Sequence, residues 1–166
     1  MNRLASWTAL LCAAAAVPAG AHDIIRHANP NLPIATSVVV PAGADIVFVS
    51  GTLPDVADGK APAGSIERFG DTETQVRSVL AKLAKELETA GFTMADVVKM
   101  NVFLVGDPRK GGAMDFEGLM KAYLQLYGLG VRNQALPART TVQVAGLPVP
   151  GALVEIEVVA ARHAAH

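Results

Sequence analysis

Alternating apolar and polar residues predict two β-strands near the C-terminus of the chain. The first strand covers residues 136–144 and the second covers residues 153–159. The segment 147–151 between them contains two prolines and a glycine, which predicts a turn. We therefore expect these two strands to form a hairpin.

The polar residues of this hairpin form the densest group of chemically active side chains in the sequence. Alternation places Arg139, Thr141 and Gln143 on one face of the first strand. It places Glu155 and Glu157 on one face of the second strand. We expect the guanidinium and both carboxylates on the polar side of the hairpin, where they could bind a substrate. The alternative is a solvated sheet face with weak cross-strand ion pairs.

The rest of the chain alternates between strands and two helices. Residues 36–40 and 45–50 predict two short strands joined by a hairpin turn, and residues 97–105 predict a third strand. Apolar residues recur at helical spacing in two further segments, 72–90 and 116–127.

The first helix has clear end signals. Thr72 and Gln75 fit a capping box at its N-terminus, and Gly91 fits a left-handed cap at its C-terminus. The complete order β-β-α-β-α-β-β indicates an α+β fold in which two helices cover one face of a ferredoxin-like, or chorismate-mutase-like, sheet. The strands are apolar on both faces and 51% of all residues are hydrophobic, which favours burial of the second face by other subunits. The alternative is a monomer with a hydrated second face.

Residues 1–21 have the pattern of a secretory signal peptide. Arg3 supplies the positive start, residues 4–17 form an apolar run, and Ala19-Gly20-Ala21 fits a cleavage site. The run is shorter than the roughly 20 apolar residues of a membrane span. We expect cleavage after Ala21, export to the periplasm or outside the cell, no membrane association afterwards, and one domain over residues 22–166.

Composition argues against several kinds of site and partner. Without residues 1–21 the chain keeps 13 basic residues (14 − 1) and 15 acidic ones, a net charge of −2, so we expect no nucleic-acid partner. Cys12 is the only cysteine and lies in the predicted leader, which leaves no disulfide and no thiol nucleophile. The four histidines lie near the two ends, at positions 22, 27, 163 and 166. We therefore expect no metal site, no cofactor and no Ser-His-Asp triad.

Three segments of the chain have the order and spacing of a known family. Pro137-Ala138-Arg139 precedes Glu155-Ile156-Glu157, residues 49–54 read Val-Ser-Gly-Thr-Leu-Pro, and residues 96–104 form a central strand motif. Together these segments resemble the Rid family of small trimeric enamine/imine deaminases. The resemblance covers roughly residues 33–161, and it implies a homotrimer with sites in the clefts between subunits.

The resemblance also implies roles for individual residues. Arg139 would hold the substrate carboxylate, because its planar fork meets a carboxylate through two hydrogen bonds. The backbone N–H of Thr141 would be a second donor. Glu155 would position the water that attacks the imine carbon, and Ser50 would line the same pocket.

Two positions depart from the pattern of the active family members. Ser37 stands where the family carries an active-site tyrosine, and Met120 stands where active deaminases carry an asparagine. Ser37 remains a candidate substrate-binding residue.

The spacing along the predicted hairpin bears on how the site is built. If the chain turns near Val149, Gln143 faces Glu155, and Arg139 lies about four residues, or roughly 13 Å, further along. Arg139 and Glu155 would then share one site only through curvature of the sheet or across a subunit boundary.

Three functions are open from the sequence. The first is deamination of a 2-imino acid or enamine, with release of ammonia and a 2-oxo acid. The second is binding of a small imino or 2-oxo acid by a trimer without turnover. The third is the endoribonuclease activity that an older family name suggests, which the acidic balance and the histidine positions disfavour.

Overall fold

The computed structural model describes residues 23–128 and 135–163 of the 166-residue chain. The predicted leader lies outside these residues. The strands are β1 (Ile25–Ala28), β2 (Ala35–Val39), β3 (Ala44–Thr52), β4 (Val97–Val105), β5 (Ala138–Val144) and β6 (Val154–His163). The helices are α1 (Thr72–Thr89) and α2 (Phe116–Leu126), with short 3₁₀ turns η1 (Met94–Asp96) and η2 (Pro108–Lys110).

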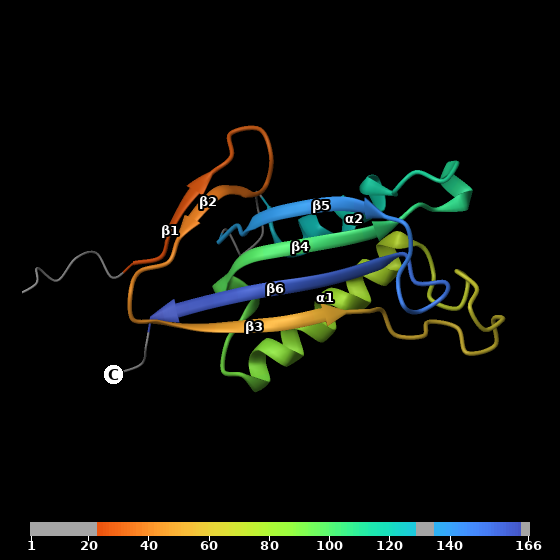
Figure 1. Cartoon of the computed structure of the whole chain (residues 1–166), viewed down its shortest axis with the longest axis horizontal. Coiled ribbons are helices and arrows are strands. Elements are labelled where there is room, and N and C mark those ends of the chain that lie inside the picture. Colours follow the sequence, from red (N-terminus) through yellow and green to blue (C-terminus); the bar gives the residue numbers. More distant parts are fainter. Residues whose placement is uncertain (1–22, 129–134, 164–166) are drawn as a thin grey trace, which may run out of the picture.

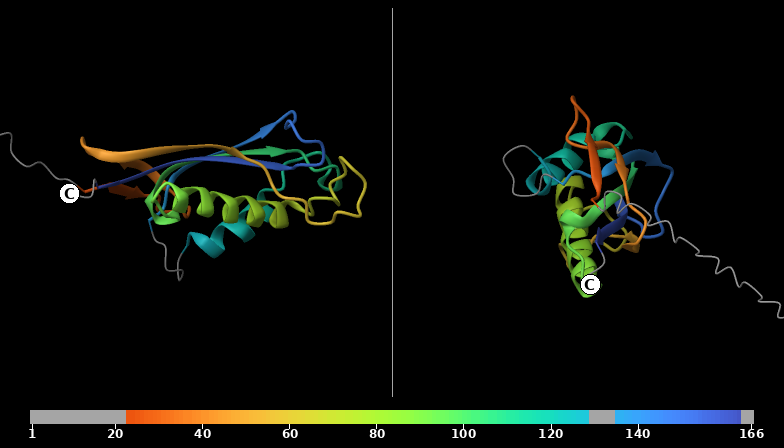
Figure 2. Two further views of the ribbon diagram at one scale, coloured as in Figure 1. Left: turned by 90° about the horizontal axis from the view of Figure 1, so that it is seen from below. Right: turned by 90° about the vertical axis from the view of Figure 1, so that its left-hand side faces the viewer.

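The six strands form one mixed sheet in the order β1-β2-β5-β4-β6-β3. Helices α1 and α2 pack against each other on one face of this sheet (Figures 1 and 2). This arrangement confirms the predicted α+β class with two helices over one face. Strand β1 was not predicted from the sequence; it pairs antiparallel with β2, and the two extend away from the main sheet in Figure 1.

Both predicted hairpins are wrong. β4 lies between β5 and β6, and β2 and β3 are far apart in the sheet. β4 is joined to β5 through α2, and such a crossover places the two strands parallel and side by side. The nine residues 145–153 then carry the chain past β4 to β6, more than the two to five residues of a tight hairpin loop. Turn residues mark a reversal of the chain, but they do not fix which strand becomes the neighbour.

The hydrophobic core lies between the two helices and the covered face of the sheet. Its largest fully buried side chains come from all layers: Leu83 and Leu87 from α1, Leu119 and Tyr123 from α2, and Met100, Leu104 and Ile156 from the sheet. Close packing of this kind fixes the position of α2 over β4 and β5.

The N-terminus of α1 differs from the predicted capping box. Asp71 is the cap, and its carboxylate accepts a hydrogen bond from the Thr74 backbone N–H at 2.8 Å. Gln75 is fully buried and its side-chain carbonyl accepts from the Leu153 N–H at 2.7 Å. An amide is preferred there because it can also donate, and it does so to the carbonyl of Gly151 at 3.2 Å. The prediction at the other end is confirmed, since Gly91 has a φ of 79°.

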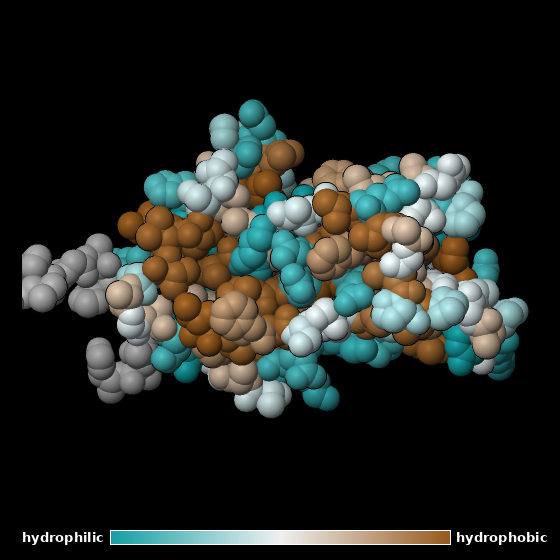
Figure 3. Space-filling view, viewed as in Figure 1, coloured by the Kyte–Doolittle hydropathy of each residue, from teal (hydrophilic) through white to brown (hydrophobic). Residues whose placement is uncertain are grey.

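The sheet face opposite the helices is open in the single chain and largely apolar. Phe48 is 78% exposed, Ile46 50% and Val142 41%. Figure 3 shows hydrophobic surface over one end of β3 and β6, beside a band of polar side chains. Surface of this kind is uncommon on a soluble monomer and suits burial against another subunit. In the described part of the chain, neither helix combines the length and the apolarity needed to cross a bilayer.

Candidate active site

Arg139 lies on the helix-covered face of the sheet, in the space between β5 and α2. Its Cζ is 4.2 Å from the ring centre of Tyr123 and 5.8 Å from that of Phe116, so the guanidinium rests on aromatic surface. Its Nη2 also points to the Met120 sulfur at 3.4 Å. All three contacts are made with α2, which explains how this helix positions the arginine.

Tyr123 is a fixed support for this arginine. It is fully buried, its hydroxyl donates to the Pro33 carbonyl at 2.9 Å, and its ring stacks on Tyr127 with centres 5.0 Å apart. Burial raises the pKa of Tyr123 to about 12, although the Arg139 charge acts in the opposite direction. The phenol is therefore neutral at physiological pH and presents its π face to the cation.

Two buried polar atoms on the same face of β5 make no hydrogen bond within the part of the chain that the structure describes. Arg139 Nη1 and Thr141 Oγ1 are buried, and neither makes a hydrogen bond among the residues that the structure describes. The two residues are two positions apart on β5 and therefore share a face. Burial lowers the pKa of Arg139, with partial compensation by Tyr123, but an arginine stays protonated at neutral pH. A buried cation with a free donor favours binding of an anion.

Glu155 lies on the other face of the sheet, so the predicted grouping of Arg139, Glu155 and Glu157 on one side is wrong. The alternation within each strand is confirmed, since Val154 and Ile156 are buried in the core while Glu155 and Glu157 point to the open face. Arg139 and Thr141 point instead to the helices. Charged residues usually face solvent, and that expectation fails for Arg139 because α2 offers it an aromatic support.

The separation of Arg139 and Glu155 within one subunit is also large. Arg139 is level with Met100 of β4, and Glu155 is level with Phe103 of the same strand. Three positions along β4 amount to about 10 Å, and two strand spacings add about 10 Å across the sheet. With opposite faces in addition, a single small ligand cannot contact both residues of one subunit.

The Glu155 carboxylate lies directly against the backbone of Gly51. A Cβ on Gly51 would lie 1.9 Å from Glu155 Oε1, so a larger residue there would push the end of the Glu155 side chain aside. No described residue donates a hydrogen bond to this carboxylate, whereas Glu157 accepts from Asn101 Nδ2 at 2.7 Å. The Ser50-Gly51 motif and Glu155 are therefore neighbours on β3 and β6, and this carboxylate is available to a ligand or a partner.

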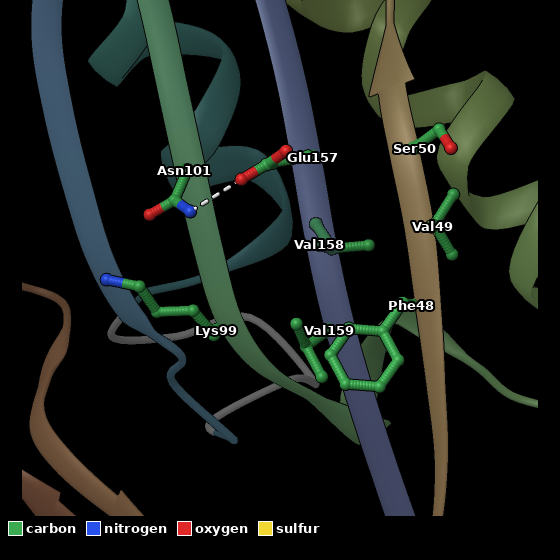
Figure 4. Close-up of a pocket in the computed structure, with 8 residues that line it drawn as sticks. All are labelled: Phe48, Val49, Ser50, Lys99, Asn101, Glu157, Val158 and Val159. Atoms are coloured by element: carbon green, nitrogen blue, oxygen red, sulfur yellow. Dashed lines mark hydrogen bonds between the residues drawn. The ribbon is translucent and has the colours of Figure 1, made fainter.

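Ser50 and Ser37 are both exposed and both lie away from Arg139. Ser50 lines a hollow of about 250 Å³ on the open face, together with Phe48, Lys99 and Glu157. In Figure 4 its hydroxyl is turned away from the bonded Asn101–Glu157 pair. Ser37 sits on β2 opposite His27 of β1, and β2 meets β5 only at Ala35 and Ala138. The structure records no hydrogen bond between either serine and Arg139.

Sequence reasoning missed the residues that hold Arg139. Phe116 and Tyr123 belong to the apolar stripe of α2, which the helical spacing assigns simply to the core. The βαβ order of β4, α2 and β5 could have indicated these contacts. The helix of such a crossover packs back on the sheet, which brings α2 over β5 and Arg139. No group of three metal-ligating side chains occurs within residues 23–128 and 135–163.

Comparisons with known proteins agree with this fold. The family model described as endoribonuclease L-PSP matches residues 32–162. A RutC family protein of Pyrococcus horikoshii is 32% identical over 139 residues, which cover 83% of this chain and 96% of the relative. The chain belongs to the Rid/YjgF family.

Solved structures of Rid/YjgF proteins share the architecture. The Rid family protein YyfB of Yersinia pestis aligns with a TM-score of 0.55 at 24% identity, over 83% of this chain and 96% of that one. Escherichia coli TdcF with bound serine aligns with a TM-score of 0.52 at 29% identity, over 79% of this chain and 95% of that one. The first likeness supports the Rid fold, and the second also shows a relative that holds a small molecule.

Proposed function

We propose that this Rid-family protein is a 2-imino acid or enamine deaminase that releases ammonia and a 2-oxo acid. The observation that carries the proposal is that Arg139 Nη1 and Thr141 Oγ1, on one face of β5, are buried and have no hydrogen-bond partner among residues 23–128 and 135–163. A substrate carboxylate would neutralise the guanidinium and accept both hydrogen bonds, which are stronger when the partners are charged.

The bound serine of TdcF supports this class of ligand. Serine and a 2-imino acid both carry a carboxylate next to a carbon that bears nitrogen. TdcF is 29% identical to this chain. By analogy, Arg139 would hold the carboxylate here and leave the carbon–nitrogen bond free for attack.

Glu155 would act as the base that positions water. It takes a proton from water as the oxygen attacks the imine carbon, and it returns a proton to the nitrogen as ammonia leaves. One imine and one water thus give one 2-oxo acid and one ammonia, with no redox step and no cofactor. The absence of hydrogen-bond donors to Glu155 in the described residues is consistent with this role.

A site made of Arg139 and Glu155 requires a second subunit, and we propose a cyclic homotrimer. The two residues lie on opposite faces and toward opposite sides of the sheet, with Arg139 at β5 and Glu155 beside β3. In a cyclic assembly each interface joins one side of a subunit to the other side of the next. The exposed apolar side chains of the open face, Phe48 of β3 among them, would be buried in the same assembly.

A second candidate is binding of small carboxylates without turnover. It is favoured by the separation of Glu155 from Arg139 and by Met120, a thioether, next to the guanidinium. Arg139 would then act as a carboxylate clamp and no residue would activate water. We do not propose RNA cleavage, because the whole chain carries a net charge of −1, whereas RNA-binding proteins usually carry an excess of basic residues.

The test is hydrolysis of 2-iminobutanoate, generated by a coupled dehydratase and followed as 2-oxobutanoate. We expect the wild type to exceed the uncatalysed rate and Glu155→Gln to lose at least about 100-fold of that activity. Glu157→Gln is the matched control, since Glu157 is on the same strand and face but bonded to Asn101. Wild-type protein that never exceeds the uncatalysed rate would leave only the binding function.

We also propose export of this protein after removal of residues 1–21. The positive start, the apolar run and the small residues at 19–21 support a signal peptide. N-terminal sequencing of protein from the periplasm should begin at His22. Recovery of a chain that still starts at Met1 from that compartment would contradict the proposal.

A further inference from the structure

Arg26 of β1 reaches across the end of the sheet and bonds to three backbone carbonyls. Its Nη1 donates to the carbonyls of Val97 at 2.7 Å and Leu136 at 2.9 Å, and its Nη2 donates to that of Ala95 at 3.1 Å. Val97 is the first residue of β4, and Leu136 lies two residues before β5. One guanidinium therefore joins β1 to the starts of both strands.

The carbonyls that Nη1 bonds lie where the hydrogen-bond ladder between β4 and β5 has not yet begun. The first pair of this ladder is Lys99 with Ala138, two positions further along each strand. Pro137, directly before this pair, has no backbone N–H to donate. On its other side β5 meets β2 at one pair only, Ala35 with Ala138. Arg26 thus closes an end of the β4–β5 ladder that the backbone leaves open.

The position of Arg139 depends on this end of the sheet. Arg139 is the second residue of β5, three positions after the Leu136 carbonyl that Arg26 holds. A slip of one residue between β5 and β4 would turn Arg139 from the helix-covered face to the open face. It would also remove the guanidinium of Arg139 from the Tyr123 ring, whose centre is 4.2 Å away.

An arginine suits this place better than a lysine. A guanidinium offers several N–H groups in one plane, and its Nη1 alone carries the two hydrogens that bond Val97 and Leu136. A lysine offers one nitrogen and should replace only part of these bonds. Burial lowers the pKa of Arg26, while its electrostatic interactions with Tyr127 and Asp96 raise it, and the side chain stays protonated at neutral pH.

We propose that Arg26 is a positioning residue for the carboxylate site, because it fixes the register of β5 against β4 and so keeps Arg139 on the α2 side of the sheet. Arg26 acts through the backbone of β5 and does not contact the ligand. Its effect on ligand affinity rests on the proposed function, since that effect requires Arg139 to hold a carboxylate. Its effect on the place of Arg139 does not.

Titration calorimetry with 2-oxobutanoate measures the effect on affinity. Arg26→Leu keeps an apolar stem without donors and should weaken binding about tenfold or more. Arg26→Lys should rescue part of this loss and bind about threefold more weakly than the wild type. Since Arg26 acts through Arg139, Arg26→Leu should change the affinity less than about twofold when Arg139→Lys is already present.

Thr36→Val is the matched control within the same pair of strands. It removes the hydrogen bond that the Thr36 hydroxyl donates to the His27 carbonyl at 3.0 Å, between β2 and β1. This bond does not involve the starts of β4 and β5. The variant should therefore bind 2-oxobutanoate as the wild type does.

The methyl signal of Met120 in NMR spectra of methionine-labelled protein reports the place of Arg139 without a ligand. The Met120 sulfur lies 3.4 Å from Arg139 Nη2, and Met120→Leu identifies the signal. It should move in Arg26→Leu, as it does when Arg139→Lys alters the contact directly, and stay in place in Thr36→Val. A merely structural Arg26 would lower the urea midpoint of unfolding and leave both this signal and the affinity unchanged.

The outcomes separate the positioning from the function beneath it. If the wild type binds no 2-oxobutanoate, the carboxylate clamp is wrong, and the Met120 signal decides the role of Arg26. If the wild type binds while both Arg26 variants keep its affinity and its Met120 signal, the positioning role is wrong. A tenfold loss that persists in the Arg139→Lys background would also overturn it. Should Arg26→Leu fail to fold, Arg26→Lys decides by the same two measurements.

Discussion

Charged side chains lie on both faces of the sheet, but their hydrogen-bond partners differ between the faces. On the open face Lys99 donates to the Thr140 hydroxyl at 2.7 Å and Glu157 accepts from Asn101 at 2.7 Å. On the covered face Arg139 has an aromatic ring and a sulfur as neighbours, and its Nη1 has no partner in the described residues.

This difference separates structural polar groups from candidate functional ones. A bonded pair such as Asn101–Glu157 already satisfies its hydrogen bonds and needs no ligand. A buried guanidinium nitrogen without an acceptor costs free energy in the empty protein, and a bound carboxylate would recover it. Glu155 is the exception on the open face, since it makes no such bond, and it is the residue that the proposed reaction uses.

The largest effect should follow from a charge placed on the open face. Phe48→Glu puts a carboxylate at a side chain that is 78% exposed in the single chain. If the trimer buries this face, the variant should fall to monomer mass in light scattering and lose its deaminase activity, because a desolvated unpaired charge is costly.

The matched control for Phe48→Glu is Val56→Glu. Val56 is 47% exposed and lies in the loop after β3, so this variant should keep the mass and activity of the wild type. A wild type that is itself monomeric at micromolar concentration would remove the interfacial site altogether.

A smaller effect is expected beneath Arg139 on the covered face. Tyr123→Phe keeps the ring but loses the hydrogen bond to Pro33, which should cost about 1 kcal/mol of unfolding free energy at pH 7. Since the ring remains, affinity for 2-oxobutanoate should stay within about twofold. Urea denaturation and calorimetry measure the two quantities, and a large loss of affinity would show that the hydroxyl itself serves the site.

The same variant has a distinct pH dependence. The pKa of Tyr123 is about 12 in the folded protein and about 10 when unfolded, so folding favours the neutral phenol. Burial of the neutral Tyr123 phenol therefore contributes fully to the free energy of unfolding below pH 10, and this contribution is lost as the pH rises from 10 to 12. The wild type should therefore lose stability over this range more steeply than Tyr123→Phe, and equal slopes would contradict the assigned burial effect. Tyr127, whose pKa burial also raises, should leave some dependence in the variant.

The sequence predicted the helices, the strands and the alternation of inward and outward residues better than it predicted which strands pair. Both helices and the inward and outward residues of β6 follow from local periodicity, which is set by backbone geometry. The pairing of β5 with β4 depends on the packing of α2 against the sheet, which the order of the elements indicates but the local pattern of either strand does not. The face of Arg139 was predicted wrongly for the same reason, because its support comes from Tyr123, sixteen positions earlier in the chain.

The structure brings only some of the candidate site residues together. Arg139 and Thr141 share a face of β5, and each has a buried polar atom without a partner in the described residues. Glu155 and Ser50 lie elsewhere, next to Gly51 on the opposite side of the sheet. The distance estimate along the predicted hairpin used the wrong strand neighbours and left two ways to join Arg139 and Glu155, curvature of the sheet or a subunit boundary. The structure does not join them within one subunit, since they lie on opposite faces.

Calorimetry with 2-oxobutanoate measures whether Arg139 binds a carboxylate. Arg139→Lys keeps the positive charge but loses the planar fork, so we expect the affinity to fall by about ten- to a hundredfold. Lys121→Gln removes a neighbouring cation of α2 that is paired with Glu117, and it should bind like the wild type. Equal affinity of Arg139→Lys and the wild type, or a wild type that does not bind 2-oxobutanoate at all, would contradict the carboxylate clamp and with it both proposed functions.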